Sequence, residues 1–367
     1  MCTENKMRLE KSPQRVTPYV MQPPRALLPY LFFLLFCALA TAHAEEQRVL
    51  NLLCWTEYVP SSVIEKFTQH TGARVVVENY NSNEQMLGML RAKPAHYDLV
   101  QPSQAYVEGL IQSHGLEPLD AAHIPNRANL DRRYRHLQHD PEEKYSVPWM
   151  AGTVGIAVNS DVVTEPIHTW ADVFSGKYAG RIVTVNDQRE MVAWALASLG
   201  QPITHVEDKA LAMTEPVLRR WLDQIAVFDS DNPHTAMAEG KAVIGIMWSG
   251  EAALLWQQDH KFQYILPKEG AHMFLDSLAI PAGAPHKELA EEFINDCLDP
   301  EISVLISKAY PYTNPNLVAR RLLTPEQLAN PASYPPNDGG LHPLSNIGND
   351  TKTVDQFVRH IRESLGH

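Results

Sequence analysis

Short apolar runs alternate with amphipathic stretches at regular intervals from residue 49 onward. The pattern predicts strands at residues 49–55, 73–77 and 97–100, and helices at residues 61–71, 84–93 and 106–114. Ser61 is expected to cap the first of these helices, and Gly72 to close it. Strand–helix–strand units of this kind bury both faces of their sheet under helices. We therefore expect an α/β fold with mixed, mostly parallel sheets flanked by helices.

The alternation stops once and then resumes, which predicts a second lobe. Residues 118–141 are polar and lack periodicity, so we expect a long surface connection there, followed by extended segments at 145–148 and 155–158. The resumed pattern predicts strands at 181–185 and 243–247 and helices at 187–200, 217–224 and 251–259. An apolar return segment follows at 277–281, then a helix pair over 287–308 broken at Pro300, and a last helix over 353–365. The predicted lobes are residues 45–150 with 277–315, and residues 151–276 with 316–367.

The first 44 residues have the layout of a secretory signal peptide. Residues 1–26 carry five basic and two acidic side chains, residues 27–42 are apolar, and Ala42-His43-Ala44 is a small-x-small cleavage pattern. A single membrane anchor is the alternative, but the apolar run is short for a span of roughly 20 residues. We expect cleavage near Ala44 and a periplasmic protein.

The predicted mature chain is acidic and holds two cysteines. Without the leader it has 26 Lys and Arg against 41 Asp and Glu, a net charge of −15, which argues against a nucleic-acid partner. Cys54 and Cys297 remain, and pairing or two buried free thiols are both open.

Catalytic signatures are missing from the sequence. It contains no H-E-x-x-H, G-x-S-x-G, P-loop or G-x-G-x-x-G motif, and its sixteen histidines are scattered. We therefore expect neither an enzyme nor a metal site or cofactor.

Carboxylates recur beside aromatic residues where strands end or helices begin. The segments are residues 55–58 (WTEY), 187–190 (DQRE), 247–251 (MWSGE), 274–276 (FLD) and 310–312 (YPY). Ligands of open α/β sheets bind at the carboxyl ends of the strands. Carboxylates there bind ammonium groups, and aromatic faces bind both cations and methylene chains. This combination predicts a site for a small polycationic amine.

Each of these residues also has a structural interpretation. Asp187 and Glu190 fit a helix capping box. Trp55 and Trp248 fit core aromatics, and Glu57 and Glu251 fit acids that favour a helix start. The sequence leaves both interpretations open for each residue.

The mature chain resembles the spermidine/putrescine-binding proteins of ABC transporters, a family of type II periplasmic binding proteins. The resemblance extends over about residues 48–335 and rests on residues 55–60 (WTEYVP), 80–84 (YNSNE), 97–103 (YDLVQPS), 230–233 (SDNP), 267–270 (PKEG) and 276–281 (DSLAIP). It implies two lobes hinged by crossing strands that close on the ligand. It also implies a monomer that delivers a polyamine to an ABC permease or, as the alternative, reports to a membrane-bound sensor.

The resemblance also implies which residues bind the amine. The predicted ligand-binding residues are Trp55, Thr56, Glu57, Tyr58, Ser103, Asp187, Glu190, Trp248, Glu251, Phe274, Asp276 and Tyr312. Three positions depart from spermidine-preferring members. Phe274 stands where those have tryptophan, Ala105 where they have tyrosine, and Glu251 falls where putrescine-preferring members place an acid. The sequence therefore leaves the length of the amine open.

Overall fold

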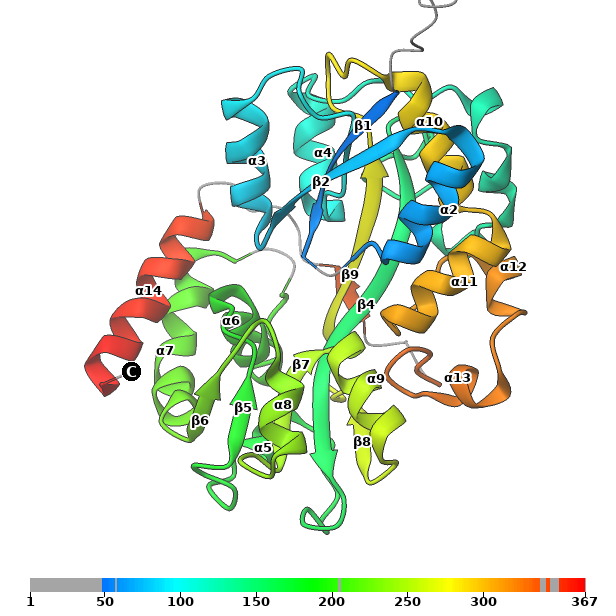
Figure 1. Cartoon of the computed structure of the whole chain (residues 1–367). Coiled ribbons are helices and arrows are strands. Elements are labelled where there is room, and N and C mark those ends of the chain that lie inside the picture. Colours follow the sequence, from blue (N-terminus) through cyan, green and yellow to red (C-terminus); the bar gives the residue numbers. More distant parts are fainter. Residues whose placement is uncertain (1–47, 57, 204–205, 337–340, 344–349, 367) are drawn as a thin grey trace, which may run out of the picture. The chain divides into compact units, whose positions relative to one another are not determined.

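The structure is a computed structural model, and it describes residues 48–56, 58–203, 206–336, 341–343 and 350–366. The chain from Arg48 to His367 forms one compact unit (Figure 1). The predicted signal peptide, residues 1–44, and the predicted ligand residue Glu57 lie outside the described residues. Among the helices that fall within the described ranges, none has both the length and the apolar character needed to cross a membrane.

The first part of the unit follows the predicted alternation of strands and helices. Its elements are β1 (Val49–Trp55), α2 (Ser61–Thr71), β2 (Arg74–Tyr80), α3 (Asn83–Ala92), β3 (Leu99–Val100) and α4 (Gln104–Gln112). β1 pairs in parallel with both β2 and β3. Gly72 closes α2 with a positive φ of 72°, as expected. The predicted serine cap is wrong, because Pro60 occupies the cap position and no side chain caps α2.

Two long strands, β4 (Ser146–Asn159) and β9 (Ala271–Ala279), form the middle of the sheet. They pair antiparallel, with a register shift between Pro148 and Met150. The sheet order is β2-β1-β3-β9-β4-β7-β5-β6, so this pair joins the two halves of the sheet. The two short extended segments predicted at 145–148 and 155–158 are therefore one continuous strand.

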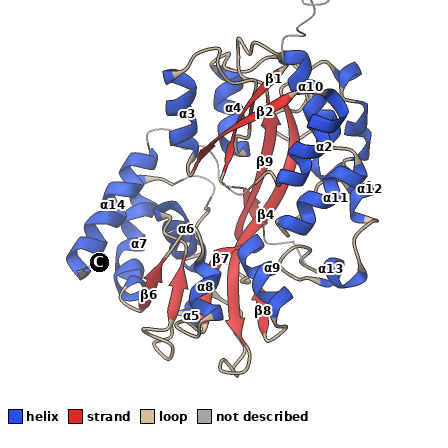
Figure 2. Ribbon diagram, viewed as in Figure 1, coloured by secondary structure: helices blue, strands red, loops and turns tan. Residues whose placement is uncertain are grey.

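The second part of the unit repeats the α/β arrangement on the other side of β4. Its strands are β5 (Ile182–Thr184), β6 (Ile225–Phe228), β7 (Ile244–Trp248) and β8 (Phe262–Ile265). Its helices are α5 (Trp170–Val173), α6 (Gln188–Ser198), α7 (Asp208–Leu222), α8 (Pro233–Ala238) and α9 (Ser249–Gln258) (Figure 2). The predicted start of α7 at residue 217 is wrong, because the helix begins at Asp208 and contains Pro216.

The C-terminal elements cover both parts. They are α10 (Lys287–Cys297), α11 (Pro300–Ala309), α12 (Leu317–Arg320), α13 (Pro325–Ala329), β10 (Leu341–Pro343) and α14 (Asp350–Leu365). The predicted break at Pro300 is confirmed: Asp299 caps α11 by accepting from the backbone N–H groups of Glu301 and Ile302. α12 contacts α11, while α14 contacts α6 and α7.

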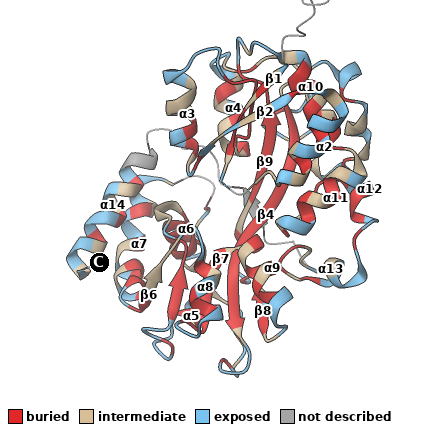
Figure 3. Ribbon diagram, in the orientation of Figure 1, coloured by how far each residue is buried: buried red, intermediate tan, exposed pale blue. Residues whose placement is uncertain are grey.

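The buried apolar residues, coloured red in Figure 3, form two cores in the first part of the unit and one in the second. One core takes Val154 and Ile156 from β4, and another takes Val147 and Met150 from the same strand. The predicted lobe boundaries stay a prediction. Cys54 and Cys297 are both buried free thiols.

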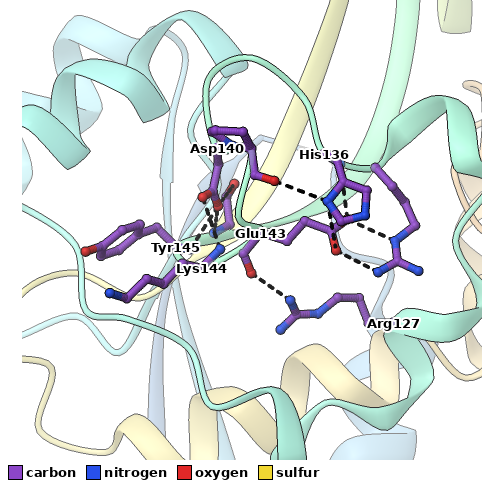
Figure 4. A network of polar contacts seen from close by, with 9 residues as sticks. Arg127, His136, Asp140, Glu143, Lys144 and Tyr145 are labelled. Carbon is purple, nitrogen blue, oxygen red and sulfur yellow. Dashed lines mark hydrogen bonds and ion pairs between the residues drawn. The ribbon is translucent and has the colours of Figure 1, made fainter.

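The segment between α4 and β4, predicted as a surface connection, contains three short 3-10 helices: η1 (Ala121–His123), η2 (Pro125–Asn129) and η3 (Arg132–Tyr134). Its end is held by polar contacts (Figure 4). The buried Asp140 carboxylate accepts backbone N–H groups from Lys144 at 3.0 Å and Tyr145 at 2.8 Å. Arg127 donates to the Glu143 carbonyl at 2.6 Å. These polar bonds hold the end of a segment whose sequence lacks the periodicity of a helix or a strand.

Candidate functional site

Asp276 lies at the centre of the candidate site. It is on β9 and only 2% exposed. The Ser103 hydroxyl, at the start of α4, donates to Oδ1 at 2.6 Å, and the Tyr58 hydroxyl, just after β1, donates to Oδ2 at 3.0 Å. Three segments far apart in the sequence therefore meet at this carboxylate.

The charge of Asp276 is poorly compensated. Burial raises its pKa to about 6, against the bonds from Ser103 and Tyr58, which lower it. None of the ion pairs among the described residues includes Asp276. Burial, followed by the charge of Asp276, also raises the pKa of Tyr58, which keeps its hydroxyl protonated and donating. A buried carboxylate in this state is a favourable partner for an incoming cation.

Five aromatic rings form a continuous row past Asp276. The centroid distances are 6.2 Å for Trp55–Tyr58 and 5.8 Å for Tyr58–Tyr312. They are 5.7 Å for Tyr312–Phe274 and 5.6 Å for Phe274–Trp248, and the last two pairs are edge-to-face. The row therefore connects the end of β1 with the end of β7. It offers ring faces to both cations and alkyl chains.

Two glycines make room for this row. A Cβ added at Gly152 would lie 2.3 Å from Cζ of Phe274, and one at Gly250 would lie 2.4 Å from Cζ of Tyr312. Neither distance is compatible with a side chain. These glycines let the rings pack directly on the backbone of β4 and of α9.

The start of α6 contributes two more acids, and only half of the predicted capping box is present. Asp187 caps the helix, because its Oδ1 accepts from the backbone N–H groups of Arg189 at 2.9 Å and Glu190 at 3.0 Å. Within the described part of the chain, the Glu190 carboxylate does not accept the backbone N–H of Asp187 that would complete the box. Glu190, 1% exposed, instead contacts Nδ1 of His272 through Oε1 at 2.5 Å. Burial, followed by the charge of Glu190, raises the pKa of Asp187 to about 6.

The remaining predicted residues are placed as follows. Glu251, in the first turn of α9, pairs with His234. Burial, followed by the charge of Glu251, raises the pKa of Tyr312. Trp55 donates its indole N–H to the Gln101 carbonyl at 3.0 Å. Thr56 is exposed and donates to Oδ1 of Asn81 at 2.7 Å, so it does not join the residues around Asp276.

Sequence reasoning missed two histidines of this region, His272 and His234. His272 could have been found, because residues 272, 274 and 276 alternate on β9 and therefore lie on one face of the strand. That face also carries Phe274 and Asp276. His234 has no such signal, since its contact with Glu251 depends on the packing of α8 against α9.

The chain is similar in sequence to known solute-binding proteins. The family model for bacterial extracellular solute-binding proteins matches residues 62–335. The spermidine/putrescine-binding periplasmic protein of Escherichia coli (strain K12) is 35% identical over 299 residues, which cover 81% of this chain and 86% of that protein. The putrescine-binding periplasmic protein PotF of the same organism is 30% identical over 318 residues, 80% of this chain and 85% of that protein.

Solved structures agree with the sequence relatives. The spermidine/putrescine ABC transporter substrate-binding protein PotD of Streptococcus pneumoniae superposes with a TM-score of 0.77 at 26% identity, covering 87% of this chain and 100% of that one. The TpPotD lipoprotein of Treponema pallidum superposes with a TM-score of 0.74 at 29% identity, covering 86% of this chain and 99% of that one.

Proposed function

This chain belongs to the family of bacterial extracellular solute-binding proteins, and on that premise we propose that it binds a polyamine such as spermidine or putrescine and delivers it to an ABC importer. Its fold is that of type II periplasmic binding proteins, as the sequence predicted. The relatives from Escherichia coli are periplasmic, so the chain acts in that compartment.

The observation that carries the proposal is the state of Asp276. Its carboxylate is 2% exposed and accepts two hydroxyl donors, and no basic side chain among the described residues forms an ion pair with it. An ammonium group would balance the negative charge of the Asp276 carboxylate and make a charge-assisted hydrogen bond to it.

The row of rings supports an alkyl amine over a metal ion. Trp55, Tyr58, Tyr312, Phe274 and Trp248 offer apolar faces along the path between the acids. The methylene groups of a polyamine would bury apolar surface there, at about 0.8 kcal/mol for each CH₂. Asp187, Glu190 and Glu251 would take further ammonium groups.

Delivery, export and the absence of catalysis complete the proposal. The pneumococcal relative is a substrate-binding protein of an ABC transporter, which favours a permease as partner over a membrane-bound sensor. We place the cleavage of the leader near Ala44 and expect no turnover of the bound amine. N-terminal sequencing of the exported protein tests the first point, and analysis of the amine after prolonged incubation tests the second.

Calorimetric titration of refolded, ligand-free protein tests the proposed ligand class. Putrescine, spermidine, norspermidine, spermine and agmatine are the ligands, and 1,4-butanediol is the matched control, since it keeps the four-carbon chain of putrescine without its charges. We expect saturable binding of at least one polyamine and none of the diol. Absence of binding for all five amines, in protein shown to be folded by circular dichroism, would overturn the proposal.

A further inference from the structure

Arginines gather in two short segments that carry none of the candidate site residues. The first is η3 with its flanking residues, 131–135 (DRRYR), and the second is residues 315–322 (PNLVARRL), which contain α12. Together the two segments hold five arginines and one acid. The arginines are Arg132, Arg133, Arg135, Arg320 and Arg321, and we call them the arginine patch.

Backbone and side-chain contacts hold the two segments side by side. The N–H of Asp131 donates to the Pro315 carbonyl at 2.9 Å. The Asp131 carboxylate accepts from Nε of Arg133 at 3.2 Å and also contacts Arg320. Figure 1 shows α12 at the edge of the first part, beside α11. The arginine patch is therefore one cluster in space, although its members are almost 200 positions apart in the chain.

Two acids neutralise only part of this cluster. Burial raises the pKa of Asp131, but the bonds from Arg133 and Arg320 outweigh burial and lower it to about 2, so this acid stays charged. Glu143 pairs with Arg135 at 2.6 Å. Five arginines against these two acids leave a local charge of +3. The arginine patch therefore has the opposite sign to the predicted mature chain, whose net charge is −15.

Two of the arginines stand beside exposed leucines. Arg132 and Arg321 are exposed, and neither forms an ion pair among the described residues. Arg321 follows Leu317 by four residues in helical backbone, so the two side chains share one face of the turn. Leu317 is 40% exposed and Leu322 is 52% exposed, the largest value for a bulky apolar residue in the part of the chain that the structure describes. Apolar side chains and guanidinium groups therefore reach solvent together.

We infer that the arginine patch, together with Leu317 and Leu322, docks the protein on an anionic phospholipid surface. Arginine binds phosphate through two parallel N–H bonds. Each basic side chain near an anionic membrane raises the affinity about fivefold. The leucines would bury apolar surface just below the headgroups, as interfacial helices do. This surface shares no residue with the candidate site, so docking and amine binding can succeed or fail separately.

A phospholipid surface fits these residues better than other anionic partners. The net charge of −15 opposes contact with a long nucleic acid, whereas a membrane can be approached with the arginine patch alone facing it. An acidic protein would pair with the arginines, but exposed leucines among them favour a partner with an apolar layer directly beneath its phosphates. The periplasm lies between two membranes, so such a surface is within reach of a protein in this compartment.

Co-sedimentation with vesicles tests the docking. The exported protein, freed of its leader, is mixed with vesicles of equal parts phosphatidylglycerol and phosphatidylethanolamine, or with vesicles of phosphatidylcholine alone. We expect binding to the first kind and none to the second. Binding in about 0.02 M salt should be mostly lost in about 0.5 M salt, because salt screens exposed charges.

Neutral substitutions locate the docking surface. The double variant Arg132→Gln, Arg321→Gln should bind the anionic vesicles about 25-fold more weakly, since two charges are removed at about fivefold each. Leu322→Ser should weaken binding severalfold although the net charge stays the same, because an apolar side chain no longer enters the headgroup layer.

A second double variant, Arg91→Gln with Arg181→Gln, is the matched control. Both arginines are exposed and form no ion pair among the described residues. Arg91 lies on α3 and Arg181 directly before β5, and Figure 1 shows both elements well apart from α12. This variant has the same net charge as the first one and should bind vesicles like the unmodified protein. Thermal melting and amine titration should give unmodified values for all three variants, which shows that they are folded.

The outcomes separate docking from the proposed function. Equal binding to both kinds of vesicle, binding to neither, or equal losses in the two double variants would overturn the inference. Binding to membranes that contain the ABC permease, without binding to pure lipid vesicles, would assign the arginine patch to a protein partner and overturn it as well. Failure of every amine to bind, with vesicle docking as expected, would refute only the proposed function.

Discussion

Replacement of Asp276 by asparagine should stabilise the empty protein near neutral pH while removing most of its affinity for polyamines. Burial raises the pKa of Asp276 from 3.8 to about 6. An acid with a raised pKa stabilises the fold at low pH, and this contribution is lost as the pH rises from about 4 through 6. At pH 7.5 the ionised carboxylate therefore costs the fold up to about 3 kcal/mol, at about 1.4 kcal/mol for each pKa unit.

Asparagine removes this cost but keeps most of the local bonding. Its Oδ1 still accepts from Tyr58 or Ser103, while one of the two charge-assisted bonds, at 3.0 and 2.6 Å, is weakened or lost. Loss of that bond costs about 1 kcal/mol, so the net gain in the free energy of unfolding is about 1–2 kcal/mol. The melting temperature of the empty protein should then rise by a few degrees at pH 7.5.

The same substitution leaves an ammonium group without its counter-charge. Polyamine affinity should fall by about 2–3 kcal/mol or more, which is about 30-fold to 150-fold. Differential scanning calorimetry of the empty protein at pH 5 and 7.5 measures the first effect, and isothermal titration the second. The gain in stability should be smaller at pH 5, where Asp276 already holds its proton for most of the time.

Asp140→Asn is the matched control for the stability measurement. Asp140 is also buried, but its carboxylate accepts backbone N–H groups from Lys144, Tyr145 and Ser146 (Figure 4). Because the amide nitrogen of asparagine cannot accept from these N–H groups, this variant should be destabilised by about 2 kcal/mol and should bind amines normally. A loss of stability at pH 7.5 in Asp276→Asn, together with unchanged affinity, would refute the reasoning about Asp276.

Three further predictions concern the site and the middle strands. Gly250→Ala should weaken amine binding at least tenfold, because the added Cβ displaces the Tyr312 ring. Gly88→Ala is the control, since an added Cβ there meets nothing within 4 Å and should leave binding unchanged. Equal amine affinities of the two variants in calorimetry would mean that the ring position is unimportant. Glu251→Ser should shift the preference from the diamine towards the triamine by about 1–2 kcal/mol of relative binding free energy. The shift is modest because a partly solvated acid is screened. Equal losses of affinity for both ligands would contradict a role of Glu251 in selecting ligand length. Small-angle scattering should give a smaller radius of gyration with saturating polyamine than in protein shown to be empty, and an unchanged radius would exclude lobe closure around β4 and β9.

The sequence alone predicts those helices and strands that are marked by residues within the element itself. β1 and α2 follow from an apolar run and from the helix-closing Gly72. The sequence predicts two extended segments where β4 is one strand. Gly152 and Gly155 lie within this strand, and their missing side chains make room for the rings of Phe274 and Tyr264. α7 begins before the predicted start at residue 217, and Pro216, a residue that usually stands in the first turn of a helix, lies within it. Both errors arise where tertiary packing overrides a local rule.

The acids of the candidate site were easier to predict than their partners. Asp187 stands at the start of α6, where the sequence itself marks a ligand position. Asp276 lies inside β9, and the sequence marks it only by its place beside Phe274 and before an apolar segment. The pairing of Glu190 with His272 joins residues 82 positions apart, and nothing local distinguishes it from a capping box. Contacts of this kind depend on how α6 is placed over β9, which a single sequence does not specify.

The two free thiols have a practical consequence. Burial raises the pKa of Cys54 to about 12 and that of Cys297 as well, so neither forms the thiolate that attacks alkylating reagents in the folded protein. A chain expressed from residue 45 onward contains no other cysteine. A single cysteine introduced on the surface would therefore be labelled selectively, without removing native residues. A fluorophore attached in this way near β4 or β9 would turn the protein into an optical sensor for its own ligand.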